Sequence, residues 1–339
     1  MKKLSRWLLR LIGPLLLVFF LWRSDLGAIA TSLAALAPWL LAASLALAPL
    51  FILVKSWRWE LIMRELSLRP PRLAYLAVLY TIGLYAGGVT PGQSGDFIKG
   101  WYLRNRGLPL GPSLFSILLD RLFDFFVMAL LSLLGLVAFI DVFPPEAQGA
   151  VRAVTVGFAA AVVVLTPALM ARGPREWALG RLTPLLPGRV RASAERFREQ
   201  LGQLSLRPGP FALLLLSTAL SAGSTMLRIW LLYLALGLAD IPLIEIIGST
   251  ALIAILQALP ISFAGIGVRD AVLVAVLARH GHPPELAISL SALFLLLNIE
   301  HILLGFLVSL RYPLGERPEQ TEGEAAVDGS DTTPPAPRI

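Results

Sequence analysis

Two short stretches of the sequence combine proline, glycine, small polar residues and charges at points where an apolar segment has just ended. Residues 90–96 read TPGQSGD, and residues 260–270 read PISFAGIGVRD. A helix broken in this way exposes backbone N–H and C=O groups that hydrocarbon cannot satisfy, so the break must lie inside protein or line a wet cavity. The helix that begins after each break points its positive dipole end at it, which suits a phosphate or a carboxylate.

Charged side chains beside both breaks add to this chemistry. Lys99 and Arg269 would contribute full positive charge, and the glycines would let a ligand approach the backbone closely. The candidate substrate-binding residues at the breaks are Pro91, Gly92, Gln93, Ser94, Gly95, Asp96, Lys99, Pro260, Ser262, Gly265, Gly267, Arg269 and Asp270. The alternative is that both stretches are ordinary membrane turns with charges at the interface.

A second group of polar residues lies within long apolar segments. A charge at the bilayer centre costs roughly 2.5 to 3.5 kcal/mol on insertion scales, so such side chains should face the bundle interior and pair. Asp120 and Asp124 are four positions apart and share a helix face, with Arg228 or Arg269 as the expected partner. The group forms either a structural salt-bridge network or a polar path for a lipid headgroup. Its candidate translocation residues are Asp120, Arg121, Asp124, Arg228, Asn298 and Glu300, with His301 beside them.

The elements that position these residues must be membrane helices. The chain has 339 residues, of which 56% are hydrophobic and only 15% charged, and its mean hydropathy is +0.74. Several apolar runs reach the roughly 20 residues that cross a bilayer, and the connections are too short for a soluble catalytic domain. The net charge of +7 lies in short loops, which favours orientation and anionic-lipid contact over nucleic acid.

The composition and the motifs of the sequence argue against bound metals and cofactors. The chain contains no cysteine, which excludes disulfides, thiol nucleophiles and cysteine-bound metals. His280 and His282 resemble a metal-binding pair but have no third ligand nearby in sequence, so a solvated loop is the expected setting. No phosphate-binding loop or dinucleotide fingerprint is present. We therefore expect no cofactor.

We predict an all-α polytopic membrane protein with about six transmembrane helices and two oppositely oriented re-entrant hairpins in one domain, residues 1–312. Spans are expected at about 7–22, 39–54, 113–140, 150–171, 211–237 and 286–310, and hairpins at about 73–106 and 241–281. The first span has no small-residue cleavage site after it, which disfavours a signal peptide. Lys55, Trp57, Arg58 and Trp59 are expected in the headgroup layer. Residues 189–204 predict an amphipathic cytoplasmic helix, and residues 313–339 a disordered tail.

The distribution of positive charge tests the hairpin prediction. If residues 73–106 enter and leave on the cytoplasmic side, the N-terminal cluster, residues 55–72, 99–106 and 172–207, and Arg311 all share that side, as the positive-inside rule requires. A complete crossing at residues 73–89 would place the arginine-rich 172–207 connection outside. The same count brings residues 241–281 in from the opposite side and puts both termini in the cytoplasm. Opposed, interrupted hairpins indicate an inverted repeat with a site near the midplane.

At these motifs the chain resembles the flippase-like membrane family that also supplies the membrane domain of lysylphosphatidylglycerol synthases. The resemblance covers about residues 5–312 and rests on GGVTPGQSGDFIKGWYLRNRG, SILLDRL and LPISFAGIGVRDAVLVAVLARHG. Lys99 stands where arginine is common, Ser94 where a second glycine is common, and Asp270 where glutamate is usual. The resemblance implies translocation of a lipid or handling of a lipid-linked sugar. The chain carries no aminoacyl-transferring domain, so lysyl transfer should be absent.

Together these features predict a lipid flippase of the inner, or cytoplasmic, membrane and not an enzyme. It would move a phospholipid, an aminoacylated lipid or a polyprenyl-phosphate-linked glycolipid through a polar cavity at the two hairpins. Its expected partners are anionic or phosphate-bearing membrane lipids and no nucleic acid. A second copy of the chain and an envelope-lipid biosynthetic enzyme are candidate protein partners. The alternatives are a membrane-embedded transferase that uses a polyprenyl-phosphate donor and an accessory subunit of an envelope-lipid enzyme.

Overall fold

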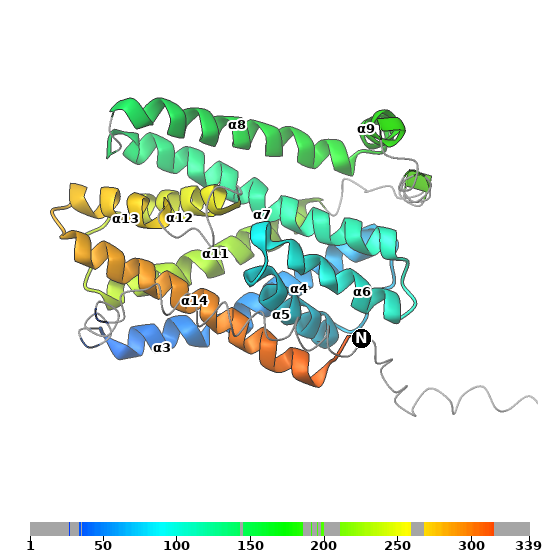
Figure 1. Ribbon diagram of the computed structural model, residues 1–339, viewed down its shortest axis with the longest axis horizontal. Helices are drawn as coiled ribbons and strands as arrows, with labels where there is room; N and C mark the ends of the chain where they lie inside the picture. Colours follow the sequence, from blue (N-terminus) through cyan, green and yellow to red (C-terminus); the bar gives the residue numbers. More distant parts are fainter. Residues whose placement is uncertain are drawn as a thin grey trace, which may run out of the picture.

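The computed structural model describes residues 36–142, 145–185, 211–258 and 268–314, with a few isolated positions outside these ranges. Every element in the described part is helical (Figure 1). In chain order the elements are α3 (Pro38–Ala46), α4 (Ala48–Glu65), α5 (Leu73–Gly88), η1 (Pro91–Phe97), α6 (Ile98–Asn105), α7 (Leu110–Phe139), η2 (Ile140–Val142), α8 (Pro145–Met170), α9 (Arg172–Leu182), η3 (Thr183–Leu185), α11 (Phe211–Ala235), α12 (Leu243–Ala258), α13 (Val268–Arg279) and α14 (Pro284–Arg311).

Five helical segments of the described part are long and apolar enough to cross a membrane. They are Pro38–Glu65, which joins α3 and α4, and Leu110–Phe139, Pro145–Thr166, Ala212–Ala235 and Pro284–Arg311. The all-α polytopic architecture predicted from the sequence is confirmed. The expected first span, residues 7–22, the whole expected amphipathic stretch 189–204 apart from four positions, and the tail beyond residue 314 lie outside the described residues.

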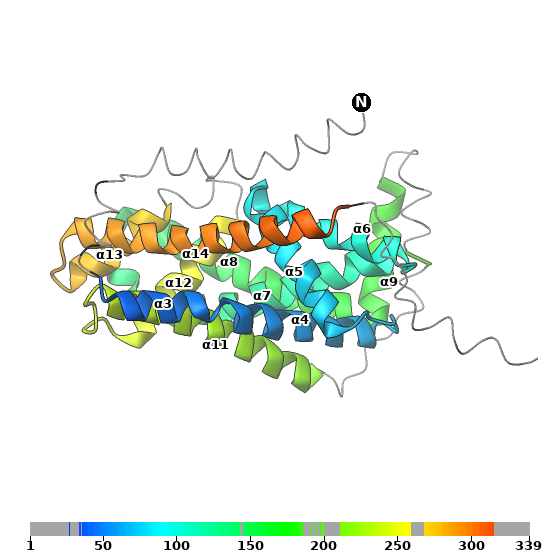
Figure 2. The same cartoon turned by 90° about the horizontal axis from the view of Figure 1, so that it is seen from below.

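The remaining apolar helices are too short to cross on their own and form two pairs. Helix α5 has 16 residues and α6 has 8, while α12 has 16 and α13 has 12, against about 20 for a bilayer core. Helices α5 and α6 pack against each other, as do α12 and α13. The two pairs lie in opposite halves of the length of the bundle (Figures 1 and 2).

The two halves of the chain share their local structure at equivalent points. Helices α4 and α11 end in the same cap, with a positive φ at Ser67 (56°) and Gly237 (75°). Helices α6 and α13 also end alike, at Gly107 (φ 86°) and Gly281 (φ 77°). In each cap the residue with positive φ and the residue after it donate to the carbonyls of the last helical turn, which is the Schellman pattern. The bonds are Ser67–Arg64, Leu68–Met63, Gly237–Leu234, Leu238–Tyr233, Gly107–Arg104, Leu108–Leu103, Gly281–Ala278 and His282–Leu277.

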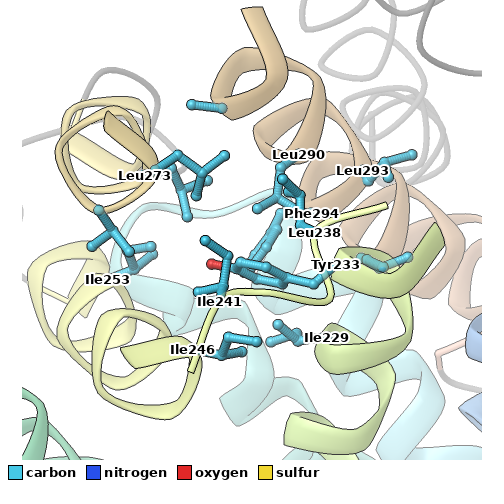
Figure 3. Packing of buried hydrophobic residues seen from close by; sticks show 14 of the residues in the cluster. Ile229, Tyr233, Leu238, Ile241, Ile246, Ile253, Leu273, Leu290, Leu293 and Phe294 are labelled. Carbon is cyan, nitrogen blue, oxygen red and sulfur yellow. The ribbon is translucent and has the colours of Figure 1, made fainter. Parts of the chain in front are cut away.

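Packing between the halves follows the same symmetry. The long arm of each hairpin packs against the long helix that follows the other hairpin, so that α5 contacts α14 and α12 contacts α7. Both contacts are close because glycine is present: a Cβ atom on Gly135 would overlap Gly248, and a Cβ atom on Gly305 would overlap the Thr81 carbonyl. The helices around these contacts bury an apolar core, whose α11–α14 part is seen in Figure 3. The longer arm of each pair, α5 and α12, is thereby fixed within the bundle.

Two local predictions need correction. The second span does not end near residue 54, because the helix continues to Glu65. Lys55, Arg58 and Trp59 are therefore buried inside the bundle and not in a headgroup layer. The basic connection after α8 also begins with a helix, α9, which the sequence did not single out.

Candidate functional site

The first break is a short 3-10 helix, η1, held by a single threonine. Thr90 Oγ1 donates to the Ala86 carbonyl at 2.8 Å and accepts from the Gly95 backbone N–H at 2.7 Å. Gly95 approaches the Ala86 carbonyl so closely that a Cβ atom would overlap it. Glycine at this position is what lets the chain fold back against the end of α5. Gln93 and Ser94, at the tip, keep exposed side chains.

The Asp96 side chain, at the end of η1, is buried and contacts two cationic side chains. Its Oδ1 lies 2.8 Å from Lys99 Nζ, and its Oδ2 accepts from Arg121 Nε at 3.0 Å. Arg121 Nη1 also donates to the Gln93 side chain. Lys99 is completely buried, with its Nζ 4.2 Å from the centroid of the Tyr80 ring and 4.8 Å from that of Trp59. Two cations against one carboxylate leave this cluster one positive charge in excess.

A second buried cluster joins α4 to α7. Arg58 Nε and Nη2 donate to Asp120 Oδ1 at 2.8 and 2.6 Å, Nη2 also to the Asp120 carbonyl at 3.0 Å, and Nη1 to Asp124 Oδ1 at 2.6 Å. Lys55 Nζ pairs with Asp124, and Tyr80 donates to Asp120 Oδ2 at 3.1 Å. Arg58 and Asp120 are both fully buried. Two cations and two carboxylates balance, which makes this cluster a neutral brace between the helices.

A third cluster occupies the equivalent place in the other half. Arg228 pairs with Glu300 on α14, and its Nη1 lies 2.8 Å from His301 Nε2. Arg228 Nε also donates to the Ser44 carbonyl at 2.9 Å, so α11 is tied to α3 as well. The alignment of the caps of α4 and α11 pairs Arg58 with Arg228. In each half, then, an arginine before the hairpin binds an acid on the helix after it.

Phe51 lies between these two clusters. Its ring stacks on His301 with centroids 5.2 Å apart, and the Lys55 Nζ lies 5.5 Å from its centroid. The Arg228 guanidinium lies 6.0 Å from the same ring. The charged interior of the bundle is thus continuous from one half to the other.

Arg269 stands at the start of α13, beside the second break. Its Nε donates to Ser291 Oγ at 2.7 Å, and Ser291 in turn donates to Asp270. Arg269 is buried, and among the described residues no hydrogen-bond acceptor meets its Nη1 atom. A buried guanidinium N–H without a partner is costly, which makes it a candidate contact for an anionic group.

Comparison with the sequence predictions separates the residues into three groups. The structure brings together Gln93, Asp96, Lys99 and Arg121, then Asp120 and Asp124, then Arg228 and Glu300, and finally Arg269 and Asp270. Pro91, Gly92, Ser94 and Gly95 lie in η1, and Asn298 is exposed on α14 outside the charged clusters of the described residues. Pro260, Ser262, Gly265 and Gly267 lie outside the described residues.

The expected partner of Asp120 and Asp124 was wrong. Neither Arg228 nor Arg269 pairs with them; Arg58 and Lys55 do. The sequence carried a signal for this, since Lys55 and Arg58 are three positions apart on one helix face directly after an apolar run. The hydrogen bond from Tyr80 to Asp120 and the ring contact of Trp59 with Lys99 had no comparable signal in the sequence.

Helices of membrane length that bury paired charges beside two pairs of short helices define a polytopic α-helical membrane protein with a polar interior. A family model described as the lysylphosphatidylglycerol synthase TM region matches residues 7–305, and the chain belongs to this family. The protein is thus a multi-pass membrane protein with a role connected to membrane lipids. Searches of curated proteins and of solved structures returned no match.

Proposed function

We propose that this protein is a flippase, a transporter that moves a phosphate-bearing lipid between the leaflets of the inner membrane. The lipid headgroup would enter the polar interior at the hairpin tips while its hydrocarbon chain stays in the bilayer. The substrate class covers phospholipids, aminoacylated lipids and polyprenyl-phosphate-linked glycolipids. The single observation that carries the proposal is the excess positive charge of the Asp96, Lys99 and Arg121 cluster at a helix break.

The arrangement of charge favours an anionic group over a cationic one. Lys99 and Arg121 outnumber Asp96 at the first tip, and Arg121 is the more exposed of the two cations, with 18% of its side chain accessible. Arg269 offers a buried, unsatisfied Nη1 atom among the described residues near the second tip. Guanidinium groups bind phosphate oxygens in a fixed planar geometry, so both arginines suit a lipid phosphate.

The proposed topology places both hairpins as re-entrant elements that enter from opposite faces. Both termini would lie in the cytoplasm, since this arrangement gathers the basic loops on one side. Transport would be non-covalent, with the acidic side chains keeping the arginines oriented. A second copy of the chain or an enzyme that makes the transported lipid are the proposed protein partners.

Exchange of labelled lipids in proteoliposomes tests this function. We expect wild-type protein to accelerate leaflet exchange of at least one lipid phosphate in a panel of phosphatidylglycerol, its aminoacylated form, phosphatidylethanolamine and a polyprenyl phosphate. Arg269→Ala and Asp96→Asn should slow that exchange. Unchanged exchange of every lipid in both variants would contradict the proposal.

The same samples separate the rival functions. A transferase that uses a polyprenyl-phosphate donor would give a covalent product, which mass spectrometry of the recovered lipids would detect. If the protein is an accessory subunit, substitution of the polar residues should leave the rate of lipid exchange unchanged. The flippase predicts exchange without any new lipid species.

A further inference from the structure

The two hairpins are closed at their bases by different chemistry at equivalent positions. At the base of α5–α6, the Arg106 guanidinium lies 3.6 Å from the centroid of the Tyr75 ring. At the base of α12–α13, His280 Nε2 lies 2.9 Å from Glu245 Oε2. Tyr75 and Glu245 are each the third residue of their helix. When the matching caps of α6 and α13 are aligned, Gly107 with Gly281, Arg106 occupies the position equivalent to His280.

A further contact repeats between the halves at these bases. The Tyr102 hydroxyl on α6 donates to the Tyr312 carbonyl just after α14, at 2.8 Å. Arg279 Nη1 on α13 donates to the Ala138 carbonyl near the end of α7, at 3.1 Å. Each short arm is therefore fastened to the end of the long helix from the other half. The correspondence supports a comparison of the two bases as one device in two versions.

Glu245 is the carboxylate in contact with His280 in the described residues, and further charged groups lie on the elements packed against α13. Glu245, which is buried, also lies 3.8 Å from Arg279 Nη1, so this carboxylate bridges two cationic side chains when the imidazole is protonated. Asp141 of η2 lines the same hollow as Arg279, and α14 contributes the exposed Glu285 in its first turn. Asp240 and Glu245 together give each histidine of this base its own carboxylate.

The second histidine belongs to the same base. His282 Nε2 lies 2.8 Å from Asp240 Oδ2 and joins the loop before α12 to the loop after α13. This hydrogen bond lowers the pKa of the Asp240 carboxyl, which keeps the carboxylate ionised as the pH falls. Both connections of the α12–α13 hairpin to the bundle are thus joined by a histidine and a carboxylate.

An imidazole gains its charge as the pH falls through the range from about 8 to 5, whereas a guanidinium stays charged throughout. We propose that the α12–α13 hairpin is closed by a proton-dependent clasp, His280–Glu245 with His282–Asp240, while the α5–α6 hairpin is closed by the proton-independent contact of Arg106 with Tyr75. Mild acid on the α12–α13 face tightens that hairpin, because protonated histidines form full ion pairs with the Glu245 and Asp240 carboxylates. Neutral and higher pH removes the two histidine ion pairs, leaves only the longer 3.8 Å contact of Arg279 with Glu245, and so loosens the hairpin.

This clasp bears on transport only if the proposed flippase function holds, in which case acid on that face slows the hairpin motion and the exchange of lipid. The clasp itself is tested without transport. The chain has no native cysteine, so spin labels can be placed at Ile244→Cys and Ala278→Cys, exposed positions on the two arms. Ala74→Cys and Arg104→Cys are the equivalent exposed pair on α5 and α6 and serve as the control.

Pulsed electron spin resonance on the full chain then measures both distances at pH 6 and pH 8. We expect the short-distance population of the 244/278 pair to fall about twofold to fivefold at pH 8, with the 74/104 pair unchanged. His280→Arg with His282→Arg should hold the 244/278 distance constant at both values of pH. A 244/278 distance that does not respond to pH, or a response that persists in the double arginine variant, would overturn the clasp. Either result leaves the lipid-exchange assay free to support or contradict the transport function.

Discussion

Arg58→Met is expected to lower the free energy of unfolding by about 3 to 5 kcal/mol, the largest stability loss for any single charge in the described part of the chain. The substitution keeps most of the side-chain volume but leaves Asp120 buried without its cation. Tyr80 remains as a donor to Asp120, and Lys55 remains beside Asp124. Neither replaces the paired hydrogen bonds that Arg58 supplies.

The measurement is denaturant or thermal unfolding in detergent, with Arg64→Met as the matched control. Arg64 lies on the same helix and pairs with Glu60, but 63% of its side chain is exposed, so its loss should cost no more than about 1 kcal/mol. Removal of both charges in Arg58→Met with Asp120→Leu should recover part of the loss, because no unpaired buried charge remains. Equal stability of Arg58→Met and Arg64→Met would show that α4 and α7 are not braced by this pair.

Arg121→Gln is expected to slow exchange of a phosphate-bearing lipid at least about tenfold, since a hydrogen bond to a charged group contributes about 1.5 to 3 kcal/mol. Arg121 carries the excess positive charge nearest the exposed tip, beside Gln93. The neutral amide keeps a hydrogen-bonding side chain but leaves Lys99 and Asp96 as a balanced pair. Arg121→Lys keeps the positive charge but loses the planar guanidinium, so its rate of lipid exchange should lie between those of wild type and Arg121→Gln.

The control for this prediction is Arg104→Gln, an exposed arginine at the end of α6 on the same hairpin. It removes one positive charge without touching the cluster. Exchange should therefore be close to wild type, and both glutamine variants should unfold at similar temperatures. Normal exchange in a folded Arg121→Gln protein, or equal slowing in Arg104→Gln, would refute a specific role for Arg121.

The fold could be predicted from the sequence because membrane helices are limited by length and by backbone hydrogen bonding. Apolar runs of fixed length locate α7, α8, α11 and α14, and the proline and glycine breaks locate the ends of the short pairs. The predicted end of the second span, near residue 54, was wrong because a basic residue after an apolar run can take either of two positions. It can lie among headgroups, or it can remain in the helix and find a buried carboxylate, as Arg58 does.

The candidate site could be predicted in its residues but only partly in its pairing. The free-energy cost of burying a charge predicts that Asp120 has a cationic partner. It does not identify the arginine, because the pairing depends on how α4 crosses α7. The ion pair between Asp96 and Arg121 depends on the conformation of η1, which the hydrogen bonds of Thr90 stabilise. The sequence alone does not predict that conformation. The equivalence of Arg58 with Arg228 emerges only after the helix caps of the two halves are aligned, because few residue identities connect them.

The central claim is that two hairpins enter the bundle from opposite faces and build the polar site between them. Cysteine labelling in this cysteine-free chain tests it directly, with membrane-impermeant reagents applied to intact cells and to inverted vesicles. Asn105→Cys at the base of the first hairpin and Arg172→Cys on α9 should react from the cytoplasmic face. Ala278→Cys at the base of the second hairpin and Glu146→Cys at the start of α8 should react from the other face. Reaction of positions 105 and 278 from the same face would contradict the opposed hairpins and the site proposed between them.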